Sequence, residues 1–269
     1  MATLYLVATP IGNLEDMTFR AVRVLSEVTL IAAEDTRSAK RLLDHYQVAA
    51  KLTSYNEHNA RAKTPAILRS LEDGDVAVVS DAGMPGISDP GHDLVVAAIA
   101  AGHDVVPIPG ASAVIAAVAA SGLPSRRFHY LGFLPRQSGP RRRALAAAAA
   151  SGDTIVVYES PHRLRSTLED ALSALGDRQI AVARELTKLY EEIWRGRISA
   201  ALDHFLEPRG EFTLVIEGIE PEVRAPQEDI SSGIAAMRDD GLSSKDAVAQ
   251  IVERYGVSRR DAYRLWHQE

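Results

Sequence analysis

The chain has 269 residues, of which 46% are hydrophobic and 25% are charged, and its formal net charge is −6. This length and balance are typical of one or two globular domains with a buried core. The sequence contains no cysteine, which excludes disulfides, thiolate nucleophiles and cysteine-bound zinc. With an acidic net charge, any binding of nucleic acid has to come from a local basic patch.

The first part of the chain alternates short apolar runs with helical patterns. The apolar runs predict strands at residues 4–8, 29–33, 52–55, 76–80 and 104–108. Strands that alternate with helices favour a mostly parallel, doubly wound α/β sheet. A helix predicted over residues 113–120, with Ser112 as its N-cap, ends at a turn over 121–125 that resembles a hinge. We therefore predict a first α/β domain over residues 1–122.

The second part repeats this alternation and predicts a second α/β domain over residues 123–218. Its predicted strands are residues 128–133, 154–158, 180–183, 192–194 and 212–217. Residues 218–229 carry two prolines and few apolar side chains, which is typical of a linker.

Three short helical patterns then predict a C-terminal helical appendage over residues 230–269. It has a basic edge, and a DNA-binding helix-turn-helix and a plain packing or dimerising module are both open interpretations. No stretch is long enough to span a membrane, and the first apolar run is too short for a signal peptide. We therefore expect a soluble, cytoplasmic protein without a membrane partner.

The loop at residues 80–91 gives the strongest indication of a ligand site. It reads S-D-A-G-M-P-G-I-S-D-P-G and lies between an apolar run and a helical pattern. Its three glycines allow positive φ and a close approach of the backbone, while its two prolines fix φ. In an open α/β sheet such loops lie at the carboxyl ends of the strands, where ligands bind. An elaborate turn without a ligand is the alternative.

Several common fingerprints are missing. The sequence has no G-x-G-x-x-G after the first strand, no phosphate-binding P-loop and no H-E-x-x-H, so we expect no metal site. The surroundings of Ser88 and Ser112 each miss the G-x-S-x-G elbow of a hydrolase by one glycine, which makes a serine hydrolase a weak alternative. The polar residues that remain at the predicted strand ends suit a nucleoside-like ligand.

Longer strings point to a known family. They are L-V-A-T-P-I-G-N-L at residues 6–14, A-E-D-T-R at 33–37, the loop at 80–91 and P-G-A-S-A at 109–113. Together they resemble the tetrapyrrole (precorrin) methylase-like superfamily. The strings F-L-P at 133–135, Y-E-S-P-H-R at 158–163 and A-R-E-L-T-K at 183–188 resemble one of its branches, the 2′-O-ribose methyltransferases of small-subunit ribosomal RNA.

This resemblance implies two α/β domains with S-adenosylmethionine in the cleft between them, usually in a homodimer. The implied substrate is a cytidine in the decoding region of the RNA of the small ribosomal subunit. The cofactor-binding residues that the resemblance implies are Pro10, Gly83, Met84, Pro85, Gly86, Ile87, Ser88, Ser112, Ala113, Leu134 and Tyr158. Met84 replaces an acidic residue of the wider superfamily, so any role of that carboxylate in tetrapyrrole enzymes does not carry over to this chain. The alternatives are a tetrapyrrole C-methyltransferase and a non-catalytic regulator that senses a nucleotide and binds DNA.

A ribose hydroxyl is a poor nucleophile, so a base should lie close to it. Carboxylates at predicted strand ends are the candidates, and Glu159 and Asp81 come before Glu34, Asp35 and Glu185. A salt bridge or a helix cap is the alternative role for each of them.

Arginines are expected to bind the RNA phosphates. The candidates cluster around the start of a predicted helix and are Arg126, Arg127, Arg136, Arg141, Arg142 and Arg143. A solvated helix start is the alternative, although the helix dipole opposes cations there, which favours a functional role.

Overall fold

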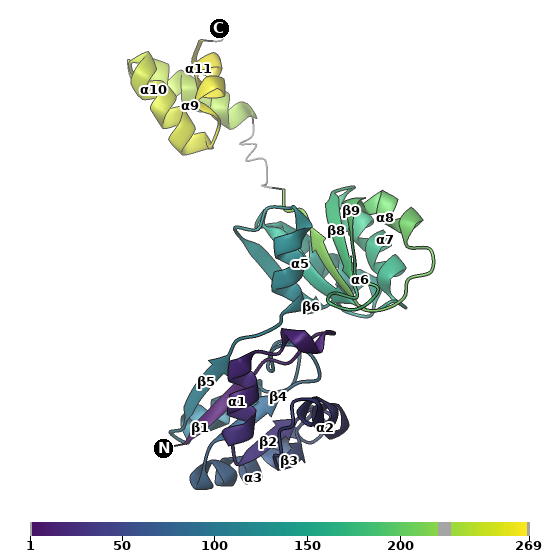
Figure 1. Cartoon of the computed structure of the whole chain (residues 1–269). Helices are drawn as coiled ribbons and strands as arrows, with labels where there is room; N and C mark the ends of the chain where they lie inside the picture. The colour runs from purple at the N-terminus through teal and green to yellow at the C-terminus, as the bar shows by residue number, and fades with distance from the viewer. Residues whose placement is uncertain (1, 220–226, 268–269) are drawn as a thin grey trace. The chain divides into compact units, whose positions relative to one another are not determined.

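The computed structural model describes residues 2–219 and 227–267, which form two separate units divided after Ile219. The first unit holds two five-stranded sheets, and the second is a group of helices (Figure 1). The expected α/β architecture with a C-terminal helical appendage is thereby confirmed.

The first sheet is parallel throughout, as the alternation of strands and helices predicted. Its strands are β1 (Thr3–Val7), β2 (Leu30–Ala33), β3 (Leu52–Ser54), β4 (Val76–Val79) and β5 (Asp104–Ile108), in the order β3-β2-β4-β1-β5. All four residues of β4 are buried, which is expected of a central strand covered on both faces. The carboxyl ends of these strands therefore meet at one edge of the sheet.

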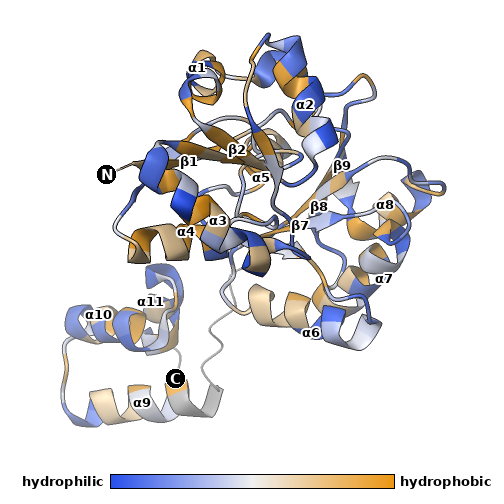
Figure 2. Ribbon diagram, turned by 90° about the horizontal axis from the view of Figure 1, so that it is seen from below, coloured by the Kyte–Doolittle hydropathy of each residue, from blue (hydrophilic) through white to orange (hydrophobic). Residues whose placement is uncertain are grey.

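Four helices cover the two faces of this sheet. They are α1 (Phe19–Glu27), α2 (Thr36–His45), α3 (Ala60–Asp73) and α4 (His92–Ala100), and a short 3₁₀ turn, η1 (Leu14–Asp16), follows β1. Apolar residues of α1 and α2 pack into one core cluster, and those of α3 and α4 pack into another on the opposite face. Figure 2 shows hydrophobic colour on β2 and hydrophilic colour on the exposed side of α2.

The second sheet is mixed, a feature that the sequence pattern did not predict. Its strands are β6 (Phe128–Phe133), β7 (Thr154–Glu159), β8 (Gln179–Arg184), β9 (Glu192–Arg197) and β10 (Phe212–Ile216), in the order β6-β7-β10-β8-β9. Only β6 and β7 pair in parallel; β10 runs antiparallel to both of its neighbours. Since no helix separates β8 from β9, these two strands also pair antiparallel.

Helices lie on both faces of the second sheet. One face carries α6 (Ser138–Ala149), α7 (Leu164–Leu175) and α8 (Ile198–His204), whose apolar side chains share a core with the strands. The other face carries α5 (Ala113–Ser121), whose Val114, Ala117 and Val118 pack against strand residues of this sheet (Figure 1). The chain thus leaves the first sheet before α5. The boundary at residue 122 stays a prediction, and this packing favours an earlier one, between β5 and α5.

The second unit contains the three expected helices, α9 (Gln227–Asp239), α10 (Ser244–Tyr255) and α11 (Arg259–His267). Ile234, Val248, Ile251 and Ala262 contribute to its small core. The Ser243 hydroxyl caps α10 by accepting from the backbone N–H of Asp246. Most of the expected linker lies outside the described residues. No helix in the described part of the chain is long and apolar enough to cross a membrane.

Candidate functional site

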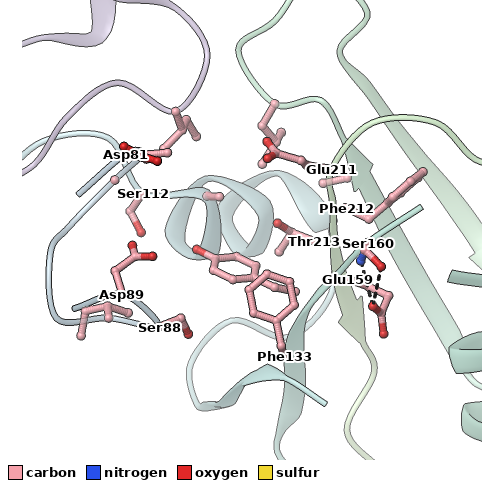
Figure 3. A pocket seen from close by; sticks show the side chains of 18 of the residues that line it. Asp81, Ser88, Asp89, Ser112, Phe133, Glu159, Ser160, Glu211, Phe212 and Thr213 are labelled. Carbon is pink, nitrogen blue, oxygen red and sulfur yellow. Dashed lines mark hydrogen bonds between the residues drawn. The ribbon is translucent and has the colours of Figure 1, made fainter. Parts of the chain in front are cut away.

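A cavity of about 510 Å³ lies where the strand-end loops of the two sheets meet (Figure 3). It is lined by several predicted cofactor residues, namely Gly83, Met84, Ile87, Ser88, Ser112, Ala113 and Tyr158. Pro10 lines a neighbouring cavity, Pro85 and Gly86 lie within the same loop, and Leu134 is buried in the core of the second sheet. The structure thus brings most of these residues to one place.

The loop at residues 80–91 is held against the first turn of the chain. Thr9 and Gly83 exchange two backbone hydrogen bonds, of 2.9 and 3.0 Å. Gly83 and Gly86 have φ values of 80° and 85°, and Ser88 has a φ of 62°, which is uncommon for a residue other than glycine. A strained, tightly fixed loop of this kind is typical of a binding site.

Aromatic side chains of the second sheet form the facing wall. The Tyr130 phenolic oxygen lies 2.7 Å from the Ser88 hydroxyl, and the ring of Tyr158 lies against Tyr130 and Phe133 at centroid distances of 5.2 and 5.6 Å. Burial raises the pKa of Tyr130 and of Tyr158. Both residues therefore stay protonated at neutral pH and cannot serve as bases.

Three carboxyl groups line the cavity on the side of the first sheet: Glu34, Asp81 and Asp89. Figure 3 shows Asp81 and Asp89 on the same side of the cavity. Burial is the main cause that raises the pKa of each, and neighbouring carboxylates add to it; the pKa of Asp89 reaches about 6. A group of carboxylates that repel one another attracts a cationic ligand, because the ligand relieves the repulsion. Asp89 belongs to the loop at residues 80–91 but is not among the site residues predicted from the sequence.

The other candidate bases are engaged in structural contacts. The Glu159 carboxylate is fully buried and accepts hydrogen bonds from the Ser160 backbone N–H (2.8 Å) and the Thr167 hydroxyl (2.6 Å). Its Oε1 also lies 3.4 Å from Nε of Arg163. Although Glu159 borders the cavity, this geometry matches the alternative role of a salt bridge and cap. Figure 3 shows its carboxylate beside Ser160 and far from Asp81.

Asp35 and Glu185 are similarly occupied. Asp35 caps α2 and pairs with Arg37, whose hydrogen bonds lower the pKa of Asp35 to about 2. Glu185 pairs with Lys188 at 2.9 Å. Asp35, Glu159 and Glu185 thus each have an ion-pair partner, which leaves Asp81 and Glu34 as the candidate bases that line the cavity without one among the described residues. Glu34 accepts a hydrogen bond from the backbone N–H of Asp81 at 3.3 Å.

The structure corrects the expectation for Arg141. Its guanidinium is buried and pairs with Asp170, with Nε donating at 2.7 Å, so it cannot reach RNA phosphates. The other predicted arginines are exposed, namely Arg126, Arg127, Arg136, Arg142 and Arg143. Two of them also approach carboxylates: Arg127 lies 3.0 Å from Asp153, and Arg142 lies 3.8 Å from Asp170.

The residues that line the cavity suit the charges and the adenine ring of S-adenosylmethionine. The cofactor carries a sulfonium and an ammonium group against a single carboxylate, and the cavity offers three carboxyl groups on one side. The opposite side offers the apolar surfaces of Phe133, Tyr158 and Leu186 for an adenine ring. Two α/β halves with such a cleft are the arrangement that the sequence resemblance implies for S-adenosylmethionine-dependent methyltransferases of the tetrapyrrole methylase type.

Comparison with known proteins agrees with this class. Residues 3–202 match the family described as Tetrapyrrole (Corrin/Porphyrin) Methylases, and the chain belongs to this family. Several relatives that match nearly the whole chain carry the name ribosomal RNA small subunit methyltransferase I. The one from Halalkalibacterium halodurans is 49% identical, covering 99% of this chain and 95% of its own. The one from Synechocystis sp. is 47% identical, covering 98% and 97%.

A solved structure supports the fold. The uroporphyrin-III C-methyltransferase of Thermus thermophilus, in complex with S-adenosyl homocysteine, superposes with a TM-score of 0.59 at 17% identity. The match covers 81% of this chain and 97% of that one. At this identity the likeness concerns the fold alone.

Proposed function

We propose that this methyltransferase acts on ribosomal RNA of the small subunit, at the ribose 2′-hydroxyl of a cytidine in the decoding region. The observation that carries the proposal is the identity of 49% to a ribosomal RNA small subunit methyltransferase I along nearly the whole chain. The strings at residues 158–163 and 183–188, which resemble the same branch, support the choice of ribose hydroxyl and nucleotide. The proposed site of action is the cytoplasm, and the proposed active form is the homodimer that the resemblance implies.

Bound S-adenosylmethionine supplies a methyl group that a sulfonium has already activated, so the protein's main task is positioning. The loop at residues 80–91 and Ser112 would hold the methionine end and the ribose of the cofactor. Tyr158 and Phe133 would cover its adenine. The carboxyl groups of Glu34, Asp81 and Asp89 would then face the sulfonium and ammonium groups at the methionine end of the cofactor, which supports placing that end on this side of the cavity.

Asp81 is the proposed general base. Its carboxyl group lines the cavity, and burial raises its pKa above the ordinary aspartate value. A higher pKa makes a carboxylate a better acceptor for the proton that the hydroxyl loses as its oxygen binds the methyl carbon. Glu159, the other sequence-based candidate, is proposed instead to fix the end of β7, because its two oxygens already accept hydrogen bonds.

The exposed arginines near α6 are proposed to contact RNA phosphates, with Arg141 left out because it is buried. Their positive charge would offset locally the net charge of −6. The assembled subunit, which presents a shaped RNA surface, is the proposed substrate form.

The proposal is tested by the transfer of labelled methyl groups to small ribosomal subunits purified from cells that lack this protein. Naked ribosomal RNA and a tetrapyrrole precursor are assayed in parallel. Label is expected in the RNA of the subunits and, after alkaline hydrolysis, in a dinucleotide, because a 2′-O-methyl group blocks cleavage at that position. Label in the tetrapyrrole alone, or in a single nucleotide after hydrolysis, would contradict the proposal.

A further inference from the structure

A second cavity, of about 430 Å³, adjoins the cofactor cavity. It lies between the turn at residues 9–12 and the helix α2, from which Ser38, Arg41 and Leu42 line it. The two cavities share residues at their border, namely Ile11, Asp81, Ala82, Lys188 and Glu211. A group bound in the second cavity would therefore meet the cofactor cavity at Asp81 and Lys188.

The two cavities differ in the charges around them. The cofactor cavity holds the carboxyl groups of Glu34, Asp81 and Asp89. The second cavity shares Arg41 with an open hollow on α2 that is also lined by Arg37 and Lys40. Lys40 and Arg41 follow Arg37 by three and four residues along the helix, so both lie beside Arg37 on the same side of it. The cofactor cavity therefore suits a cation. In the second cavity Arg41 and Lys188 are balanced by Asp81 and Glu211. The phosphate-binding character belongs to the hollow on α2, where the three cations outnumber its one carboxylate, Asp35.

The pairs that these cations form are easily exchanged. Arg37, with 88% of its side chain exposed, pairs with Asp35, and Lys40 pairs with Asp44 near the other end of the helix. Arg41 donates to the Ser38 hydroxyl at 3.2 Å. Exposed ion pairs contribute little free energy, so an RNA phosphate can replace the carboxylate without a large loss.

Lys188 is fixed at the border between the cavities. Its ammonium group lies 2.9 Å from Glu185 and 2.8 Å from Glu211. Burial lowers the pKa of Lys188, but the hydrogen bonds to these two carboxylates outweigh it and raise the pKa, so the group stays charged. Gly12 packs directly against the Lys188 stem, because a Cβ at residue 12 would overlap Cγ of that lysine.

We propose that the second cavity receives the target nucleotide, and that Arg37, Lys40 and Arg41 bind the phosphates of the strand on either side of it. The cavity volume lies within the range of ligand pockets. A ribose held there presents its hydroxyl at the border, where the Asp81 carboxylate accepts the proton and the Lys188 ammonium stabilises negative charge that develops on the oxygen. This assignment rests on the proposed function, since it requires an RNA substrate.

Two variants of α2 and a matched control test the assignment. Arg41→Glu reverses a charge at the mouth of the cavity, and Ser38→Phe fills the cavity. Arg69→Glu makes the same charge change on the exposed side of α3. The measurements are kcat and KM for methyl transfer to small subunits that lack the modification, and the affinity for S-adenosylhomocysteine by calorimetry.

We expect Arg41→Glu to raise KM for the subunits about tenfold or more, since a phosphate contact is replaced by a repulsion. Ser38→Phe should reduce transfer by a similar factor, and both variants should bind S-adenosylhomocysteine within about twofold of the wild type. Arg69→Glu should match the wild type in both measurements. If Ser38→Phe does not fold, the assignment is tested by Arg41→Glu and by a double variant that combines Arg37→Glu with Lys40→Glu.

Wild-type KM and kcat in the folded α2 variants would overturn the assignment while leaving the proposed function intact. Failure of the wild-type protein to methylate ribosomal RNA would overturn the proposed function itself, and this assignment with it. The same assay therefore separates the two proposals: the wild-type protein tests the proposed function, and the α2 variants test the assignment of the second cavity.

Discussion

The Ser88 hydroxyl lies 2.7 Å from the phenolic oxygen of Tyr130, so one hydrogen bond joins the loop at residues 80–91 to β6. The contact depends on Gly132, which has a φ of 62° at an irregularity in the pairing of β6 with β7. A Cβ at residue 132 would lie 2.9 Å from the Ser88 oxygen. The two walls of the cofactor cavity are therefore tied together at a point where only glycine fits without strain.

Removal of this hydrogen bond should weaken cofactor binding. Tyr130→Phe is expected to reduce the affinity for S-adenosylhomocysteine by about 1 kcal/mol, or about fivefold, because the walls lose a direct link. In a Ser88→Ala background the same change should have no further effect. Calorimetric titration of the two single variants and the double variant measures this. If the double variant lost as much affinity as the two single variants together, the two side chains would act independently.

The pH dependence of stability should reveal Asp89. Its pKa rises from 3.8 to about 6, with burial as the first cause and repulsion from Glu34 as the second. An acid whose pKa rises on folding binds its proton more tightly in the folded chain than in the unfolded chain. The stability of the ligand-free protein should therefore fall as pH rises from about 4 to about 7, and urea denaturation at a series of pH values measures it.

Asp89→Asn is the control for this effect. The amide does not titrate, so the fall in stability over the same pH window should be smaller, with a remainder from Glu34 and Asp81, whose pKa values are also raised. Affinity for the cationic cofactor should rise over this window in the wild type, because only the carboxylate attracts it. An unchanged pH profile in the variant would rule out a titrating Asp89.

The sequence allowed the loops at the strand ends to be located better than the packing around them. Strings at strand ends identified the loop at residues 80–91 and Ser112, since the residue types that shape a turn are local. The parallel first sheet followed from the alternation of strands and helices for the same reason. The mixed strand directions of the second sheet and the packing of α5 depend on contacts between segments that are distant in the sequence. The periodicity of apolar residues along the chain gives no information about such contacts.

Arg141, a predicted RNA-binding residue, and Lys188, which was not a predicted site residue, show the same limit. Arg141 belongs to a run of three arginines that is typical of an exposed basic patch, yet Asp170, 29 residues further along the chain, binds it in the interior. Lys188 is the last residue of the string A-R-E-L-T-K at residues 183–188. Its place between two cavities depends on a hydrogen bond to Glu211, which lies on another loop. Charge patterns in the sequence indicate which residues can bind a ligand, and only the fold decides which are already paired.

Asp81 and Glu159 should respond differently to loss of charge. Asp81→Asn is expected to reduce methyl transfer about 100-fold or more with little change in stability, because a general base is lost. Glu159→Gln should instead lower the free energy of unfolding by about 2 kcal/mol, because the charge-assisted bonds to Ser160 and Thr167 are lost inside the protein. Single-turnover transfer and urea denaturation separate the two effects.

Thr167→Val serves as the control for Glu159, since it removes one of the same hydrogen bonds from the other side. It should destabilise the protein in the same direction and leave transfer by the folded enzyme within a few-fold of the wild type. If Glu159→Gln abolished transfer while Thr167→Val did not, and stability were unchanged in both, Glu159 would be the base.

The arginines of α6 should divide into one structural residue and several binding residues. Arg141→Met leaves Asp170 buried without its main partner and should cost about 3 kcal/mol of stability. Arg143→Ala, at an exposed position of the same helix, should leave stability unchanged and weaken binding to small subunits. The slope of the logarithm of the affinity against the logarithm of the salt concentration should become shallower by about one unit, since one phosphate contact is lost. Co-sedimentation with subunits at several salt concentrations measures this. A salt dependence equal to that of the wild type would remove Arg143 from the RNA-binding surface and leave the α2 cations as the proposed phosphate contacts.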